Sequence, residues 1–295
     1  MTSLTPHAKA IDLEDGPTSG ASAVPITTVT GDGAGALAAL GAAVAEAGGG
    51  LGEVVARTLA DGRTALRAEA LLPRESRRAL SAALARGDAT ASWAVGDPEA
   101  PPRIALLVSR EGHCALDLLD RPPAELGGTV VLVLSNHDAL RGEVERRGVP
   151  FHHVPVDRER RDEAEAAQLA LLAGQCDLVV LARYMQVLSP GFLEGVGAPV
   201  INVHHSLLPA FPGGRPYERA HARGVKLVGA TAHYATEELD AGPIIEQDVA
   251  RVEDRDGPDR LRRIGADVER RVLARAVRWH CQGRVVRDGQ RTVVL

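Results

Sequence analysis

The alternation of hydrophobic and polar positions begins at Pro25 and predicts a small domain. Residues 1–24 lack this periodicity and are rich in Thr, Ser, Gly and Pro, which is typical of a flexible tail. The pattern then predicts a strand, a helix, two strands joined by an Asp61-Gly62 turn, a helix and a strand: Ile26–Thr30, about Ala34–Ala47, Leu51–Leu59, Thr64–Leu72, Arg74–Arg86 and Thr90–Val95. This βαββαβ order predicts a ferredoxin-like α+β domain over residues 25–96, with two helices on one face of an antiparallel sheet.

A proline-rich segment, 97–103, separates this domain from a second one. It can continue neither a helix nor a central strand, and it is interpreted as a linker. Over residues 104–295, short apolar runs alternate with helical segments, which predicts an α/β domain with a mostly parallel, Rossmann-like sheet. The runs are Ile104–Val108, Val130–Leu134, Asp177–Ala182 and Pro199–Val203. We expect the functional site beyond the carboxyl ends of these strands.

The remainder of the second domain has a different pattern. Two further strands are predicted to be more antiparallel, and a long helix and a closing hairpin follow them: Gly229–Ala235, Ile244–Val252, about Pro258–Gln282, and Arg284–Val286 with Thr292–Leu295. The hairpin turns at Asp288-Gly289.

Composition and charge exclude several classes of protein. The chain has 295 residues, which allows two domains, and its 45% hydrophobic and 25% charged residues are typical of a soluble globular protein. A net charge of −5 lacks the basic excess of nucleic-acid-binding proteins. The sequence has neither a long apolar run nor a signal-peptide pattern, so we expect a cytoplasmic protein with no membrane contact. Cys114, Cys176 and Cys281 are widely spaced and are predicted to be reduced thiols.

Two patterns that could indicate a cofactor are interpreted otherwise. The run Gly31-Asp32-Gly33-Ala34-Gly35 approaches a dinucleotide fingerprint, but the next two strands share a short turn and must be antiparallel, so Asp32 is expected to cap a helix. The histidine pairs at 152–153 and 204–205 could suggest a metal. Adjacent histidines in a strand point to opposite faces, however, and no H-x-x-x-H spacing is present, so no metal is expected.

The densest candidate chemistry follows the apolar strand that ends at Val203. Asn202 and His204 project from the same side of an extended segment. An amide donor beside an imidazole can stabilise the oxyanion that forms when a nucleophile adds to a carbonyl, and the imidazole can move protons. Asp240 lies in an acidic loop before the strand at Ile244, where a carboxylate could orient a histidine or a water molecule.

Longer motifs around these residues resemble the folate-dependent formyltransferase superfamily, and within it the formyltetrahydrofolate deformylases. The motifs are Asn202-Val203-His204-His205-Ser206-Leu207-Leu208-Pro209, Leu181-Ala182-Arg183-Tyr184-Met185-Gln186-Val187-Leu188-Ser189, Gly229-Ala230-Thr231-Ala232-His233-Tyr234 and Leu239-Asp240-Ala241-Gly242-Pro243-Ile244-Ile245. The resemblance covers residues 103–295. It implies that the amino-terminal domain is an ACT domain, a regulatory module with the βαββαβ order.

The resemblance also implies the site. The catalytic residues are expected to be Asn202, His204 and Asp240. The pterin-binding residues are expected to be Met185, Gln186, Val187, Leu188, Glu238, Leu239 and Gly242. No cofactor or metal is implied. A methionine or glycine effector at the ACT-like domain and a homo-oligomer are expected from the family, and nucleic acid is not.

The implied reaction is hydrolysis of 10-formyltetrahydrofolate to tetrahydrofolate and formate, which supplies formate for purine synthesis and balances the one-carbon folate pool. Two alternatives remain open: transfer of the formyl group to an amine, and a non-catalytic folate or metabolite sensor. The loop Ser109–Asp117 has a single glycine and many side chains, so it is a poor phosphate cradle and favours water as acceptor. The chain departs from the family at Pro212, where a lysine is usual.

Overall fold

The small amino-terminal domain has the predicted βαββαβ order. The computed structural model describes residues 21–87, 91–157, 159–209 and 216–295. Four antiparallel strands lie in the order β2-β3-β1-β4, as a ferredoxin-like fold requires. The elements are β1 (Ala21–Thr30), α1 (Gly33–Glu46), β2 (Gly50–Thr58), β3 (Thr64–Pro73), α2 (Arg77–Gly87) and β4 (Ser92–Val95).

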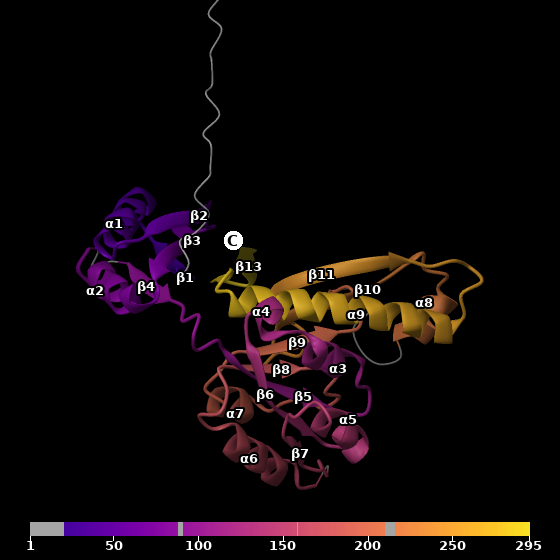
Figure 1. Ribbon diagram of the computed structural model, residues 1–295. Coiled ribbons are helices and arrows are strands. Elements are labelled where there is room, and N and C mark those ends of the chain that lie inside the picture. Colours follow the sequence, from indigo (N-terminus) through magenta and orange to yellow (C-terminus); the bar gives the residue numbers. More distant parts are fainter. Residues whose placement is uncertain (1–20, 88–90, 158, 210–215) are drawn as a thin grey trace, which may run out of the picture.

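One face of this sheet carries its core. Alternate residues of β3, from Leu66 to Leu72, point to the helices and are fully buried with Leu40 of α1 and Leu80 of α2. Figure 1 shows both helices on the same side of the sheet. Asp32 caps α1 as expected, because its Oδ1 accepts a hydrogen bond from Gly35 N at 2.9 Å.

The start of β1 differs from the prediction. Residues 21–24, which we assigned to the tail, pair with β3, where Ala21 lies opposite Pro73. The sequence pattern did not predict this part of the strand, because its residues are small and Pro25 follows them. This part also lies beyond the residues of β1 that pair with β4. Residues 1–20 and Thr90 lie outside the described residues.

The second domain contains a seven-stranded sheet in the order β11-β10-β9-β8-β5-β6-β7. The strands from β9 to β7 are parallel, whereas β10 and β11 are antiparallel, so the predicted mixture of directions is confirmed. The strands are β5 (Arg103–Val108), β6 (Thr129–Ser135), β7 (Phe151–His153), β8 (Leu178–Leu181), β9 (Val200–His204), β10 (Leu227–Tyr234) and β11 (Ile244–Arg251). Strand β7 was not predicted because it has three residues, two of them histidines.

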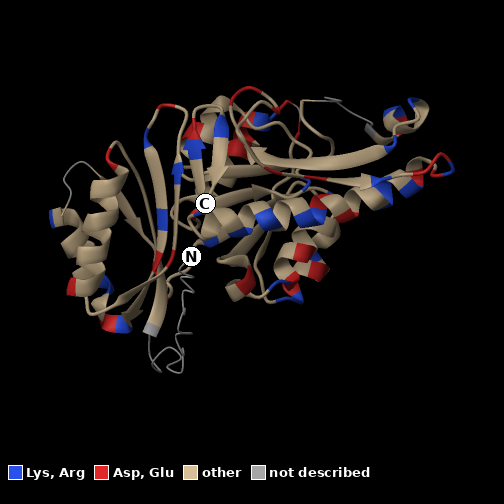
Figure 2. Ribbon diagram, turned by 90° about the horizontal axis from the view of Figure 1, so that it is seen from above, with Lys and Arg blue, Asp and Glu red and all other residues tan. Residues whose placement is uncertain are grey.

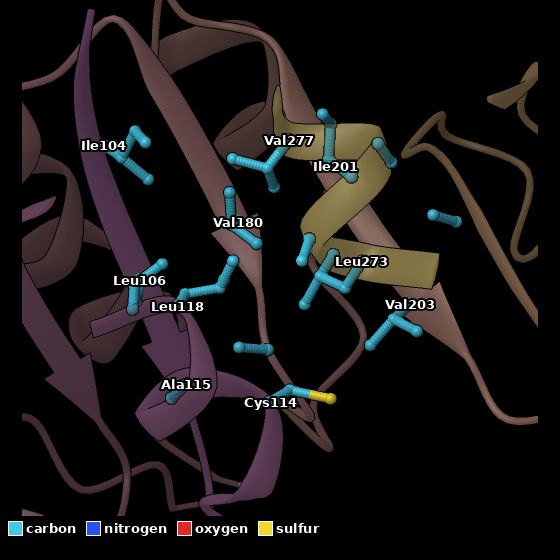
Figure 3. Close-up of a cluster of buried hydrophobic side chains, with 14 of the residues drawn as sticks. Ile104, Leu106, Cys114, Ala115, Leu118, Val180, Ile201, Val203, Leu273 and Val277 are labelled. Carbon is cyan, nitrogen blue, oxygen red and sulfur yellow. The ribbon is translucent and has the colours of Figure 1, made fainter. Parts of the chain in front are cut away.

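Helices cover both faces of the large sheet. One face packs against α3 (His113–Asp120) and α9 (Pro258–Cys281), and Figure 3 shows Val180, Ile201 and Val203 meeting Leu273 and Val277 there. The other face packs against α6 (Arg161–Leu172) and α7 (Pro190–Gly195). Alternate residues of β5 belong to different cores, as expected for a strand buried on both faces. We call these the α9 face and the α7 face. The remaining described α-helices are α4 (Pro123–Leu126), α5 (Arg141–Glu145) and α8 (Pro216–Ala222).

The closing hairpin joins the two domains. Strands β12 (Val285–Asp288) and β13 (Arg291–Val294) form the predicted pair. Val286 and Leu295 are buried against Leu59 and Ala65 of the small domain. Asp288 Oδ2 also accepts a hydrogen bond from Ala60 N at 3.1 Å.

Charged residues of both signs are interleaved along α9, as Figure 2 shows. No helix in the described part of the chain is long and apolar enough to cross a membrane.

Candidate active site

The site is built on the last residues of β9, at the carboxyl edge of the sheet. Ile201 and Val203 point into the core of the α9 face. Asn202 and His204 alternate with them and therefore point to the α7 face, as the sequence predicted. In the adjoining β10, His233 lies opposite Asn202 and Thr231 lies opposite His204.

His233 fixes the orientation of the Asn202 amide. The sequence analysis did not assign His233 to the site. His233 Nδ1 lies 3.0 Å from the carbonyl oxygen of Tyr234, which can only accept, so Nδ1 carries the proton. Its Nε2 therefore accepts a hydrogen bond from Asn202 Nδ2 at 3.2 Å. Burial lowers the pKa of His233, which keeps this ring neutral near pH 7. One N–H of the Asn202 amide remains available to a ligand.

Asp240 and His204 form a pair. Asp240 Oδ2 lies 3.3 Å from His204 Nδ1, and Asp240 Oδ1 lies 3.8 Å from His233 Nε2. The interaction with His204 lowers the pKa of Asp240 below its ordinary value, so this carboxylate is ionised near pH 7. His204 Nε2 is buried and has no hydrogen-bond partner among the described residues. An acceptor on one imidazole nitrogen leaves the other free to act on a ligand.

The turn that presents Asp240 has an unusual backbone. Asp240 itself has a φ of 57°, in the left-handed region. A Cβ atom at Gly242 would lie 1.8 Å from the carbonyl oxygen of Tyr234, so only glycine fits there. Thr236 Oγ1 donates to the carbonyl oxygen of Glu238 at 3.0 Å. Close backbone packing and the Thr236 hydroxyl, rather than the acidic side chains, hold this turn.

A cavity of about 330 Å³ opens beside these residues. Asn202, His204 and Asp240 line it, together with the predicted Met185, Gln186, Val187, Leu188 and Leu239. Glu238 and Gly242 were predicted to bind the ligand, but they do not line the cavity; they shape the turn behind it. Met185, Val187 and Leu239 are 58%, 53% and 64% exposed, so the cavity has an apolar mouth.

The loop from Arg183 to Ser189 is held in place before any ligand binds. Ser109, at the end of β5, accepts a hydrogen bond from Met185 N at 3.0 Å and donates one to Asn136 Oδ1 at 2.7 Å. Gln168 of α6 donates to the hydroxyl of Tyr184 at 2.9 Å. Three further contacts come from the same helix, in which Arg161 donates to Val187 O and Glu165 accepts from both the backbone N–H and the hydroxyl of Ser189. The backbone of Gln186 is thus positioned at the cavity.

In the described part of the chain, one group of side chains consists of residue types that can bind a metal: His113, Cys114 and Glu269. His113 Nε2 lies 2.8 Å from Glu269 Oε2, and Arg183 Nε lies 3.5 Å from the same oxygen. A guanidinium at this distance already neutralises the carboxylate and repels a cation. The group is therefore interpreted as an ion-pair network, not as a metal site.

Pro212 and Arg215, where the sequence departs from the family, lie outside the described residues.

Comparison with known proteins shows the family of the chain. A family model described as formyl transferase matches residues 102–277. The chain is 60% identical over 195 residues to a formyltetrahydrofolate deformylase of Mycobacterium tuberculosis, which covers 66% of this chain and 63% of the relative. The matched region thus spans less than two thirds of that relative. A formyltetrahydrofolate deformylase of a Synechocystis species is 52% identical over 207 residues, covering 69% of this chain and 72% of the relative.

Solved structures extend the similarity to both domains. A formyltetrahydrofolate deformylase from Pseudomonas syringae pv. tomato superposes with a TM-score of 0.84 and 40% identity, covering 92% of this chain and 94% of that one. Glycinamide ribonucleotide transformylase 1 from Symbiobacterium toebii has a TM-score of 0.61 and 33% identity, and it covers 66% of this chain and 94% of that one. The chain belongs to the formyl transferase family, among the formyltetrahydrofolate deformylases.

Proposed function

We propose that the protein hydrolyses 10-formyltetrahydrofolate to tetrahydrofolate and formate. The observation that carries the proposal is the grouping of Asn202, His204 and Asp240 at one end of a preformed cavity. Among the solved structures that match over both domains is a formyltetrahydrofolate deformylase.

The cavity suits the folate part of the substrate. The loop from Met185 to Leu188 offers backbone donors and acceptors to the pterin edge, because tertiary contacts hold it in one conformation. The apolar side chains of Met185, Val187 and Leu239 stand exposed at the mouth, where an aromatic ring can cover them. We propose that the formyl group then lies near Asn202 and His204.

The proposed mechanism follows from the side chains of Asn202, His204 and Asp240 at this end of the cavity. A water molecule held by the Asp240 carboxylate attacks the formyl carbon, and Asp240 accepts its proton. The remaining amide N–H of Asn202 and the imidazole of His204 stabilise the oxygen that becomes negative. The bond from carbon to N10 then breaks, and N10 takes up a proton as tetrahydrofolate leaves. Formate is the second product.

The amine-acceptor alternative has less support. The glycinamide ribonucleotide transformylase matches 66% of this chain, whereas the deformylase from Pseudomonas syringae matches 92% and thus both domains. The loop after β5 also uses its side chains internally, since Glu111 binds Arg183 and His113 binds Glu269. A non-catalytic sensor would not need the paired Asp240 and His204.

The test is formate release from 10-formyltetrahydrofolate by the purified protein without an added amine. We expect turnover by the parent and a fall of at least about a hundredfold in kcat for Asp240→Asn and His204→Ala. Glu253→Gln, which changes an exposed carboxylate outside the cavity, is the matched control. Near-normal turnover by His204→Ala would disprove the assigned roles.

We also propose that hydrolysis needs no metal. The two oxygens of Asp240 face histidine nitrogens, and Glu269 is paired with a guanidinium. Prolonged treatment with a chelator should leave formate release unchanged, and loss of activity that is restored by a divalent cation would refute this.

Wider roles are proposed from the family and the exposed small domain. The domain at residues 25–96 is proposed to be an ACT domain that binds a methionine or glycine effector and links the protein into a homo-oligomer. Its edge strand β2 is exposed along most of its length, including Leu51 and Val54, which supports association. Three unpaired cysteines support a cytoplasmic location, and the products suit formate supply for purine synthesis.

A further inference from the structure

A buried carboxylate that the proposed mechanism does not use lies behind the active site. Glu269 of α9 is 2% exposed. Its Oε1 accepts a hydrogen bond from the hydroxyl of Tyr217 at 2.7 Å, and its Oε2 lies 2.8 Å from His113 Nε2. Arg183 reaches the same oxygen and also binds Glu111 Oε2, with Nη2 at 2.6 Å. Burial alone would raise the pKa of Glu269, but its contacts with His113 and Arg183 outweigh burial and lower it.

We call this group the acceptor-side network. It joins four segments, and its members are Glu111, His113, Arg183, Tyr217 and Glu269. Glu111 and His113 come from the loop after β5 and the start of α3, Arg183 from the end of β8, Tyr217 from α8 and Glu269 from α9. The packing is tight, because a Cβ atom at Gly265 would lie 2.0 Å from the Tyr217 hydroxyl. Removing a charged member would leave a buried charge without its partner, which is strongly destabilising.

The network and the cavity loop lie on opposite sides of the sheet edge. Asn202 and His204 point to the α7 face, where the loop from Met185 to Leu188 lies. Glu269 lies on the apolar stripe of α9 between Gly265 and Val272, so the network fills the α9 side of the same edge. A folate in the cavity occupies one side, and the network occupies the other.

His205 connects the network to the catalytic end. Its ring lies edge-on to those of His204 and Tyr217, with centroids at 4.9 and 6.3 Å. Burial, assisted by the charge of Arg183, lowers the pKa of His205 to about 4, so the ring is neutral under working conditions. Arg183 and His205 both line the cavity. They form its wall on the α9 side.

We infer that the acceptor-side network, with His205, determines the acceptor: it packs the α9 side of the catalytic end, from which an amine would approach the formyl carbon, and so favours water. The inference rests on the proposed function. If the network were opened, a primary amine could attack the formyl carbon. The carbon–N10 bond would break, the amine proton would pass through Asp240 to N10, and an N-formyl amide would replace formate.

The experiment measures how the formyl group partitions between water and glycinamide, a small primary amine. The parent should give formate with a background level of N-formylglycinamide. Tyr217→Ala removes a buried ring between His205 and Glu269, and we expect it to raise the ratio of N-formylglycinamide to formate at least about tenfold. The ratio does not depend on how much protein is folded, so a merely structural loss would leave it unchanged.

Two further variants make the test specific. Glu269→Gln keeps the shape but removes the charge, and it should raise the ratio less than Tyr217→Ala does. Arg275→Ala removes an arginine from the same helix whose partners are Glu246 and Asp248 of β11, so it should leave the ratio at the parent's value. An unchanged ratio in both Tyr217→Ala and Glu269→Gln would overturn the inference. If the parent released no formate at all, the proposed function would fail instead.

Discussion

At the scale of single residues, the site depends on one histidine that holds another donor in place. His233 accepts from Asn202, so the Asn202 amide has one orientation. We predict that Asn202→Ala lowers kcat about 10²- to 10³-fold, because a donor to the developing oxyanion is lost. His233→Ala should lower kcat less, about tenfold, with little change in KM, because it acts through Asn202. Steady-state formate release measures both, with His152→Ala as control. Equal effects of both variants would show that His233 has a direct role.

A second histidine, His280, makes stability depend on pH. Its Nδ1 lies 2.7 Å from the Tyr234 hydroxyl, and burial lowers its pKa to about 4 from 6.5. Because the unfolded chain binds this proton more readily, the stabilisation is complete above about pH 6.5 and is lost as pH falls towards 4. The loss is on the order of 3 kcal/mol at most. His280→Gln keeps an acceptor for Tyr234 and should flatten the fall in Tm between these pH values. His221→Gln, at an exposed site, should not.

At the scale of elements, the loop after β8 is a preformed binding surface. Ser109 links it to the ends of β5 and β6. Ser109→Ala removes the acceptor of Met185 N, and we predict that KM for the folate rises several-fold while kcat changes little, since the reacting groups lie on β9 and the Asp240 turn. Ser81→Ala, in an exposed serine of α2, is the control. A fall in kcat at constant KM would place Ser109 in the chemistry rather than in binding.

The same elements show what could be predicted from the sequence. The alternation of side chains along a strand predicted that Asn202 and His204 lie on the same face of β9. This could be predicted because the alternation depends only on the local backbone. His233 was missed because its role depends on the pairing of β10 with β9, which hydrophobic pattern does not specify. Glu269 had a signal that we did not use: a carboxylate in the apolar stripe of a predicted helix. Its partners come from distant segments, so its network could not be derived.

At the scale of the whole molecule, the closing hairpin couples two domains that have separate cores. Val286 is 7% exposed and packs with Leu295 against Leu59 and Ala65 of the small domain. Val286→Asp would place a charge in this apolar cluster, at a cost of several kcal/mol if the domains stayed together. We therefore predict that the domains separate and that calorimetric unfolding changes from one transition to two. Formate release should stay within about twofold of the parent, because every residue that lines the cavity lies between 181 and 240.

The matched control is Val249→Asp, in a valine of β11 that is 42% exposed, which should leave one transition. A single, unshifted transition in Val286→Asp would mean that the hairpin does not couple the domains. Loss of formate release with the large domain still folded would have a different meaning. The small domain touches the hairpin and not the cavity, so the effect would have to pass through the contacts of the hairpin with the large domain. One such contact joins Thr292 Oγ1 of β13 to the carbonyl oxygen of Ile244, at 2.6 Å, close to the Asp240 turn.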